Sequence, residues 1–153
     1  MTTLYLMRHG HSPLREECGV RTDALRPLSE RGRRDAERAA AEILRRGGRP
    51  SLILHSPLLR AVQTAAAAAQ TLGLAPEPFA ALDNTLPPAE ALEALRVRAA
   101  SAPEVLAVGH QPQVGEIASL LTGATLEFRP ATLVALELSA RARALWTLPP
   151  AGI

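Results

Sequence analysis

The sequence contains no lysine, a single cysteine and few aromatic residues. Its seventeen basic residues are all arginine, and fifteen acidic residues leave a net charge of +2. Any cationic group at a functional site must therefore be an arginine, a histidine or the amino terminus. Because Cys18 stands alone, an internal disulfide is excluded and a reducing compartment is favoured. The positive charge is small and interspersed with acidic residues, which argues against nucleic-acid binding.

Long hydrophobic runs are also missing. The longest apolar runs fall far short of the ~20 residues that a membrane span needs, and the first residues lack a basic leader and a cleavage site. A hydrophobic content of 47% argues against disorder, and 153 residues favour one domain. We therefore expect a single cytoplasmic domain over residues 1–153, with neither nucleic acid nor a membrane as its partner.

Short apolar runs alternate with helical patterns along the chain. Strands are predicted at residues 4–7, 51–55 and 105–108, with a weak strand near 77–80 and terminal strands at 126–128, 133–138 and 145–148. Helices are predicted at residues 29–46, 56–72, 89–100 and 112–121, and residues 11–28 are predicted to be an irregular connection. This alternation is typical of an α/β domain with a mostly parallel sheet.

Polar clusters follow three of the predicted strands. They are residues 8–10 (Arg-His-Gly), residues 55–60, which begin with His-Ser and end with Arg, and residues 109–110 (Gly-His). Ligands of parallel α/β sheets bind beyond the carboxyl ends of the strands, so we expect the three clusters to meet there. The planar fork of arginine fits phosphate oxygens, and imidazole can attack phosphorus or donate a hydrogen bond. The sequence therefore predicts a phosphate site that needs no metal ion.

The same clusters match known motifs. Residues 8–10 resemble the RHG signature of the histidine phosphatase superfamily, which has the phosphoglycerate-mutase-like fold. Residues 56–65 (SPLLRAVQTA) resemble the family's second arginine motif, and residues 108–112 (VGHQP) resemble its second histidine motif. The three motifs occur in the family's order. The resemblance implies a three-layer α/β/α fold with a mostly parallel central sheet, and a phosphatase without cofactor or metal.

The resemblance also implies roles for individual residues. His9 is expected to be the nucleophile that becomes a phosphohistidine, with Arg8 and Arg60 binding the phosphoryl oxygens. His110 is expected to donate to those oxygens as negative charge develops, because phosphoryl transfer depends on positioning and electrostatic stabilisation. Two guanidinium groups beside the His9 imidazole disfavour its protonation. Gly10 is expected to let the backbone approach the bound phosphate.

A further resemblance points to one branch of the family. Residues 23–29 (DALRPLS) are similar to the D-x-x-R-P-L-[ST] stretch of the small SixA-type phosphohistidine phosphatases. It implies that Arg26 contacts phosphate and that Asp23 orients Arg26 or donates a proton. Other branches use a carboxylic acid to protonate the leaving oxygen, and Asp83 and Glu90 are the candidates here, outside any motif. An imidazole leaving group demands less protonation than an alkoxide, so this pattern favours a phosphohistidine substrate.

Other interpretations remain open at the level of sequence. Arg26 and Asp23 can also form a simple ion pair, and His55 can be a packed histidine at a strand end. The partner can be a phosphorylated protein or a small phosphorylated molecule such as a sugar or nucleotide-loop phosphate. A mutase is disfavoured because little of the chain is free to form a lid. A non-catalytic phosphoprotein-binding module is the alternative from a different functional class.

Overall fold

A mixed six-stranded sheet forms the centre of the computed structural model, which describes residues 2–138 and 143–151. The strand order in the sheet is β3-β2-β4-β1-β5-β6. Strands β1, β2, β3 and β4 pair in parallel, whereas β5 and β6 are antiparallel to their neighbours. The strands are β1 (Thr2–Arg8), β2 (Leu52–His55), β3 (Glu77–Pro78), β4 (Glu104–Gly109), β5 (Leu133–Leu138) and β6 (Ala144–Leu148). The prediction of a mostly parallel sheet is confirmed.

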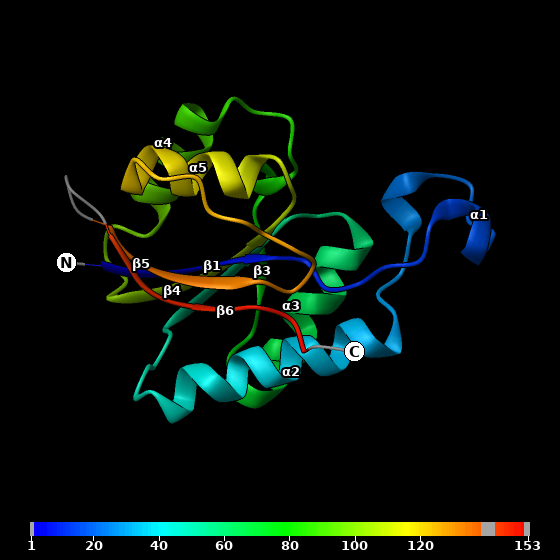
Figure 1. The fold of residues 1–153 in the computed structure, drawn as a ribbon, viewed down its shortest axis with the longest axis horizontal. Helices are drawn as coiled ribbons and strands as arrows, with labels where there is room; N and C mark the ends of the chain where they lie inside the picture. Colours follow the sequence, from blue (N-terminus) through cyan, green and yellow to red (C-terminus); the bar gives the residue numbers. More distant parts are fainter. Residues whose placement is uncertain (1, 139–142, 152–153) are drawn as a thin grey trace.

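Helices cover both faces of this sheet (Figure 1). One face is packed by α2 (Glu30–Arg45) and α3 (Leu59–Leu72), and the other by α4 (Pro88–Arg98) and α5 (Gln113–Thr122). Alternate side chains of β1 enter the two cores, because successive residues of a strand point to opposite faces. The molecule is therefore the three-layer α/β/α domain that the resemblance implied. None of its helices within the described residues is long and apolar enough to span a membrane.

Four local predictions differ from the structure. The connection at residues 11–28 contains two short helices, α1 (Arg15–Cys18) and the 3₁₀ helix η1 (Asp23–Leu25), and a further 3₁₀ helix, η2, covers Ala80–Leu82. Helix α3 begins at Leu59 instead of residue 56, because the chain stays extended at Leu58. Residues 126–128 form no strand, and their last carbonyl, that of Phe128, accepts a hydrogen bond from the Arg8 side chain at 2.9 Å.

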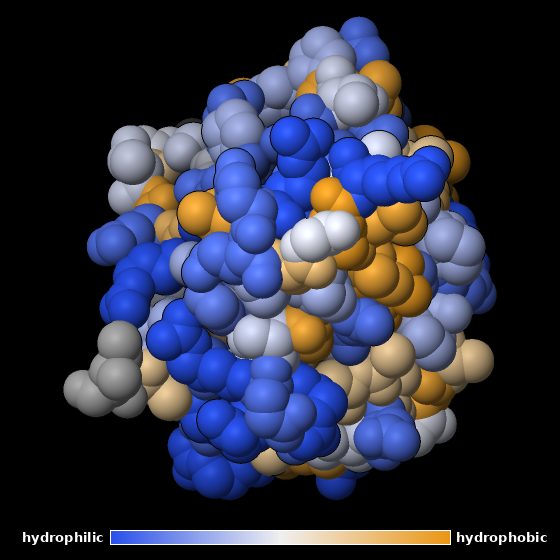
Figure 2. Space-filling model, turned by 90° about the vertical axis from the view of Figure 1, so that its right-hand side faces the viewer, coloured by the Kyte–Doolittle hydropathy of each residue, from blue (hydrophilic) through white to orange (hydrophobic). Residues whose placement is uncertain are grey.

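The carboxyl ends of the central parallel strands lie side by side. In the sheet register Arg8 of β1 pairs with Gly109 of β4, and His55 of β2 pairs with Val108 of β4. The three polar clusters therefore meet at one edge, as predicted. Helix α1 lies beyond this edge, at the right of Figure 1. Figure 2 looks onto that side of the molecule, where hydrophobic residues interrupt a largely hydrophilic surface.

Candidate active site

His9 stands at the end of β1 with a fixed ring orientation. Its Nδ1 lies 2.7 Å from the backbone oxygen of Gly10, and its backbone nitrogen donates to the oxygen of Gly109 at 2.9 Å. Because a carbonyl oxygen can only accept, the ring proton must reside on Nδ1. The other ring nitrogen, Nε2, then carries a lone pair. His9 is 7% exposed, so this potential nucleophile is nearly enclosed.

Burial also keeps the His9 ring neutral. It lowers the pKa of His9 to about 3, and the nearby charges of His110, Arg60 and Arg8 act in the same direction, whereas the bond to Gly10 opposes them. A histidine with so low a pKa is unprotonated throughout the physiological range. The environment therefore preserves the lone pair that nucleophilic attack requires.

His110 follows β4 and faces His9. The centroids of the two rings are 5.1 Å apart. Its Nε2 lies 2.7 Å from the hydroxyl oxygen of Ser56, while its Nδ1 is buried without a hydrogen-bond partner among the described residues. Burial, followed by the charge of Arg60, lowers the pKa of His110 to about 4. The His110 ring is thus neutral. Its Nε2 is hydrogen-bonded to Ser56, and its Nδ1 has no hydrogen-bond partner among the described residues.

Arg8 and Arg60 bring two guanidinium groups to the same edge. Arg8 donates through Nη1 to the backbone oxygen of Phe128, and Arg60 donates through both Nη atoms to Asp23, at 2.9 Å each. The Nε atoms of both arginines are buried without a partner within residues 2–138 and 143–151. Burial of an unsatisfied donor is costly, and an anion that accepts from it removes the cost.

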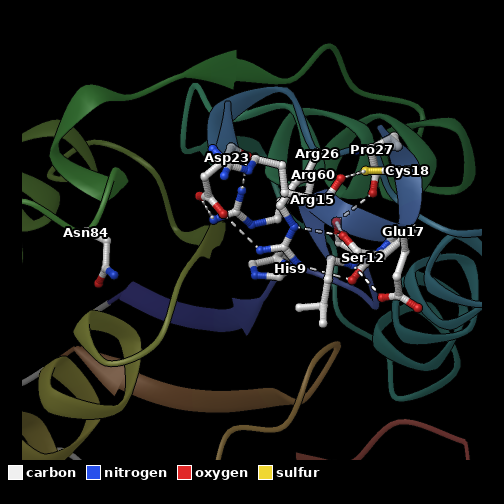
Figure 3. A network of polar contacts seen from close by, with 12 residues as sticks. His9, Ser12, Arg15, Glu17, Cys18, Asp23, Arg26, Pro27, Arg60 and Asn84 are labelled. Atoms are coloured by element: carbon white, nitrogen blue, oxygen red, sulfur yellow. Dashed lines mark hydrogen bonds and ion pairs between the residues drawn. The ribbon is translucent and has the colours of Figure 1, made fainter. Parts of the chain in front are cut away.

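Asp23 links two arginines in the network of Figure 3. Its Oδ2 accepts from Arg60, and its Oδ1 accepts from Nη1 of Arg26 at 3.0 Å. The bond from Arg26, together with the charge of Arg60, lowers the pKa of Asp23 and keeps it ionised. Arg26 also donates to the backbone oxygens of Pro13 (2.8 Å) and Ser12 (3.1 Å). Arg26 therefore ties the loop after β1 to Asp23, and its contact with phosphate stays a prediction.

Gly10 lies where β1 passes against α2. A Cβ atom added to Gly10 would lie 2.8 Å from the backbone oxygen of Gly32, closer than side-chain carbons approach such an atom. This close packing is a reason for glycine that does not involve phosphate. The backbone nitrogen of Gly10 donates to Thr64 Oγ1, which in turn donates to the backbone oxygen of Arg60. Thr64 thus connects the two chain segments that carry His9 and Arg60, and phosphate binding by Gly10 stays a prediction.

The two other carboxylates proposed as acids lie in different surroundings. Asp83 follows η2, and the next residue, Asn84, donates to the backbone oxygen of Gln111 beside His110 at 3.0 Å. Its Oδ1 accepts from the backbone nitrogen and the hydroxyl of Thr85. Glu90 is exposed in the first turn of α4. The described residues contain no group of three or more histidine, cysteine, aspartate or glutamate side chains that could hold a metal ion.

Sequence reasoning missed three contacts at this site. It placed Ser56 at the start of a helix, whereas the Ser56 hydroxyl contacts His110. It did not single out Thr64, and it linked Asp23 to Arg26 but not to Arg60. Ser56 and Thr64 both lie inside the quoted 56–65 motif, so the motif itself was the available signal. No pattern in the sequence near Asp23 or Arg60 predicts the contact between η1 and α3 that these two residues form.

The model of the histidine phosphatase superfamily (branch 1) matches residues 4–86, more than half of the chain. The chain belongs to the histidine phosphatase superfamily. An uncharacterized protein of Picosynechococcus sp. is 35% identical over 144 residues, which cover 88% of this chain and 84% of that protein. Membership of this family makes the protein a phosphatase.

Solved structures of this histidine phosphatase fold include small SixA proteins. The protein histidine phosphatase SixA complexed with tungstate has a TM-score of 0.87 at 22% identity, with 97% of each chain covered. A putative phosphohistidine phosphatase SixA from Agrobacterium tumefaciens has a TM-score of 0.83 at 27% identity, covering 97% of this chain and 98% of its own. A mycobacterial glucosyl-3-phosphoglycerate phosphatase follows at 0.70 and 20%, covering 94% and 97%. The likeness to SixA extends over nearly the whole chain.

Proposed function

We propose that this histidine phosphatase removes the phosphoryl group from phosphohistidine in a protein, through a covalent phosphohistidine on His9. The observation that carries the proposal is the set of three buried nitrogen atoms without partners: Nε of Arg8, Nε of Arg60 and Nδ1 of His110. All three belong to residues that the motifs had selected. The ring of His110 lies 5.1 Å from that of the neutral His9, and the charges of Arg8 and Arg60 act on His9. A phosphoryl group placed there gives each of these nitrogens an acceptor.

The first step is an attack of His9 Nε2 on phosphorus. Its lone pair forms the new P–N bond, while the bond from phosphorus to the leaving group breaks and the leaving group keeps that electron pair. The Nδ1–H of His9 stays bonded to the backbone oxygen of Gly10, which steadies the ring as it becomes cationic. Arg8, Arg60 and His110 stabilise the charge on the phosphoryl oxygens.

The second step is hydrolysis. Water attacks the phosphorus of phosphorylated His9, the P–N bond breaks, and its electron pair returns to Nε2. Inorganic phosphate leaves and the neutral ring is restored.

The surroundings of the carboxylates favour a nitrogen leaving group. Asp23 is held ionised between Arg26 and Arg60, so it is poorly suited to donate a proton. An imidazole leaving from phosphohistidine demands less protonation than an alkoxide leaving from an ester. With Asp23 unsuited to donate a proton, the site favours phosphohistidine over an ester.

The surface beside the site suits a protein substrate. Leu14, which precedes α1, is 57% exposed, and Leu25 of η1 is 51% exposed. Leu25 lies two residues from Asp23, which contacts Arg60 directly. A protein that carries the phosphohistidine would contact these two leucines, because Leu14 follows Pro13, which accepts a hydrogen bond from Arg26, and Leu25 is close in sequence to Asp23. They support a phosphorylated protein over a small sugar phosphate.

A substrate panel tests this function. We expect a phosphohistidine-bearing protein and a phosphoramidate to be hydrolysed at least tenfold faster, in kcat/KM, than common phosphomonoesters. A chelator should leave every rate unchanged, since the mechanism uses no metal ion. Equal rates across the panel, or faster hydrolysis of a monoester, would contradict the proposed substrate.

The second candidate is hydrolysis of a small phosphomonoester. The bond from Asn84, next to Asp83, to Gln111, next to His110, favours it, because it brings Asp83 to the side of the site where it could protonate an ester oxygen. If Asp83 is the acid, Asp83→Asn lowers hydrolysis of monoesters by tenfold or more and leaves phosphoramidate hydrolysis unchanged. If the first proposal is right, Asp83→Asn changes neither rate by more than about threefold.

A further inference from the structure

Ser56 lies between β2 and α3 and is fully buried. Its backbone nitrogen donates to the oxygen of Val108 at 3.0 Å, which fixes it against β4. Its hydroxyl oxygen accepts from the backbone nitrogen of Leu58 at 3.1 Å and lies 2.7 Å from Nε2 of His110. The backbone bond to Val108 and the bond from Leu58 therefore hold the Ser56 hydroxyl next to the His110 ring.

The direction of the bond between Ser56 and His110 follows from the available protons. The amide of Leu58 already donates to the Ser56 oxygen, so the hydroxyl proton needs an acceptor. Within the described part of the chain, the acceptor in hydrogen-bond reach is Nε2 of His110. If Nε2 donated instead, the buried hydroxyl proton would lack a partner, at a cost of about 1–3 kcal/mol.

The neutral imidazole of His110 has only one N–H group. With Nε2 accepting from Ser56, that proton resides on Nδ1. Nδ1 is the nitrogen that is buried without a partner among the described residues. The hydroxyl of Ser56 thus determines that the unsatisfied nitrogen of His110 is a donor rather than an acceptor.

We propose that Ser56 is a positioning residue that holds His110 in the tautomer with its proton on Nδ1, so that Nδ1–H can donate to a phosphoryl oxygen. The role of the donated bond rests on the proposed function, whereas the tautomer is a property of the resting protein. Ser56 acts through His110 and does not itself touch the reacting atoms.

The arrangement at His9 is the complement of that at His110. A backbone oxygen touches Nδ1 of His9 and can only accept, so it leaves Nε2 of His9 with a lone pair. A hydroxyl touches Nε2 of His110 and donates, so it leaves Nδ1 of His110 with a proton. A nucleophile needs a lone pair on the nitrogen that faces phosphorus, whereas a donor needs a proton on the nitrogen that faces the phosphoryl oxygens. The backbone oxygen of Gly10 provides the first state at His9, and the hydroxyl of Ser56 provides the second at His110.

His55 provides an internal control. Its Nδ1 lies 2.8 Å from the backbone oxygen of Ser56, an arrangement like that of His9 with Gly10. Replacing the Ser56 side chain removes the hydroxyl beside His110 and leaves this backbone oxygen in place. The tautomer of His110 should therefore change, while those of His9 and His55 should not.

The direct test reads the tautomers by long-range ¹H–¹⁵N correlation spectra of protein labelled with ¹⁵N-histidine, at neutral pH, with His110 assigned through His110→Gln. We expect the proton of His110 on Nδ1 in the wild type, and a substantial population with the proton on Nε2 in Ser56→Ala. A wild-type His110 with its proton on Nε2, or the same tautomer in both proteins, would overturn the proposal. This readout holds whether or not the protein hydrolyses phosphohistidine.

Kinetics give a second readout that a purely structural role would not change. We expect Ser56→Ala to lower kcat about tenfold at pH 7.5, less than the roughly 10²–10³-fold that follows complete loss of a donor, because part of the His110 population keeps its proton on Nδ1. The deficit should shrink as the pH falls to about 4, the lowered pKa of His110, because a protonated His110 carries protons on both nitrogens and no longer depends on Ser56. The charged groups that face His110 are unchanged in the variant: Arg60, Arg8, Asp23 and Asp83.

Two matched variants accompany Ser56→Ala. Ser56→Thr keeps the hydroxyl and should restore the Nδ1–H tautomer and most of kcat. Ser51→Ala removes a serine hydroxyl just before the opposite end of β2, where it donates to the backbone oxygen of Glu104, and should behave as wild type. A deficit in kcat that is the same at pH 7.5 and pH 4, with an unchanged tautomer, would assign Ser56 a purely structural role and overturn the proposal.

Discussion

Arginine side chains have different surroundings on the outer face of α2 and at the carboxyl edge of the sheet. On α2, Arg33 forms ion pairs with Glu30 and Glu37, three and four residues away, and all three side chains are exposed. At the sheet edge, Arg8 and Arg60 are bonded to backbone oxygens and keep buried Nε donors without partners among the described residues. The residue type is the same in both regions, and burial decides what it can do.

The two regions also differ in energy. An exposed pair spaced three or four residues apart on a helix contributes about 0.2–0.5 kcal/mol, because water screens it. A buried donor without a partner has already lost its water, so an anion that reaches it gains a strong, charge-assisted bond. Substitutions of exposed arginines on α2 should therefore change stability and catalysis very little, whereas substitutions of Arg8 or Arg60 at the sheet edge should change catalysis.

The largest effect is expected for the nucleophile. His9→Ala should lower turnover by roughly 10⁴-fold or more, because the covalent path is lost. The matched variant is His55→Gln, at the end of β2, where a buried histidine has the same bond to a following backbone oxygen. It should keep turnover within about fivefold in the same assay. Appreciable turnover by His9→Ala would refute the covalent mechanism.

Arg60→Lys should lower kcat by roughly 10²–10³-fold, the range found when one donor to a developing charge is removed. Lysine keeps the charge but lacks the fork that bonds Asp23 through two nitrogens. Arg33→Lys makes the same change on α2 and should leave kcat within about twofold. If steady-state kinetics showed equal effects of the two variants, the contrast between the regions would be wrong.

Acid should destabilise the protein through His9. Its folded pKa of about 3 lies below the ordinary value of 6.5, so the unfolded chain binds more protons between these limits. Stability should therefore fall as the pH decreases through this window, by about 3 kcal/mol from His9 between pH 7 and pH 4. Urea unfolding at both values should show a smaller loss in His9→Gln. Equal losses in the two proteins would contradict the lowered pKa.

A smaller effect is expected where α2 packs against the loop after β1. A Cβ on Gly32 would lie 2.5 Å from the backbone oxygen of His11, so Gly32→Ala should cost roughly 1–3 kcal/mol despite alanine's higher helix propensity. Arg34→Ala, two residues on and exposed, should change stability by less than about 0.5 kcal/mol. Thermal unfolding of both variants gives the comparison, and a stabilised Gly32→Ala would show that the loop can move away.

Local pattern was enough to predict the sheet and the meeting of the motifs. Buried apolar runs end at Arg8 and at Gly109, and parallel pairing aligns those ends, so the neighbourhood of His9 and His110 followed from topology. The strand predicted at residues 126–128 was wrong because an apolar run does not reveal where its backbone bonds go. The oxygen of Phe128 is used by the side chain of Arg8.

Contacts between distant side chains were beyond the sequence. The bond from Arg60 to Asp23 joins positions 37 residues apart, across a segment without periodicity. Ser56 before a proline is typical of a helix start, and only the packing of β2 beside β4 reveals that its hydroxyl reaches His110. The motifs predicted which residues gather, and the folded chain determines which nitrogen of each is available.

The phosphorylated state of His9 is the most direct test of the account. The protein is mixed with a phosphoramidate, quenched in alkali within milliseconds, digested and analysed by mass spectrometry. We predict one phosphoryl group per chain on His9, stable in alkali and lost in acid, and no labelling in His9→Ala. A phosphoryl group on another residue, or turnover at the normal rate without any labelled His9, would contradict the account.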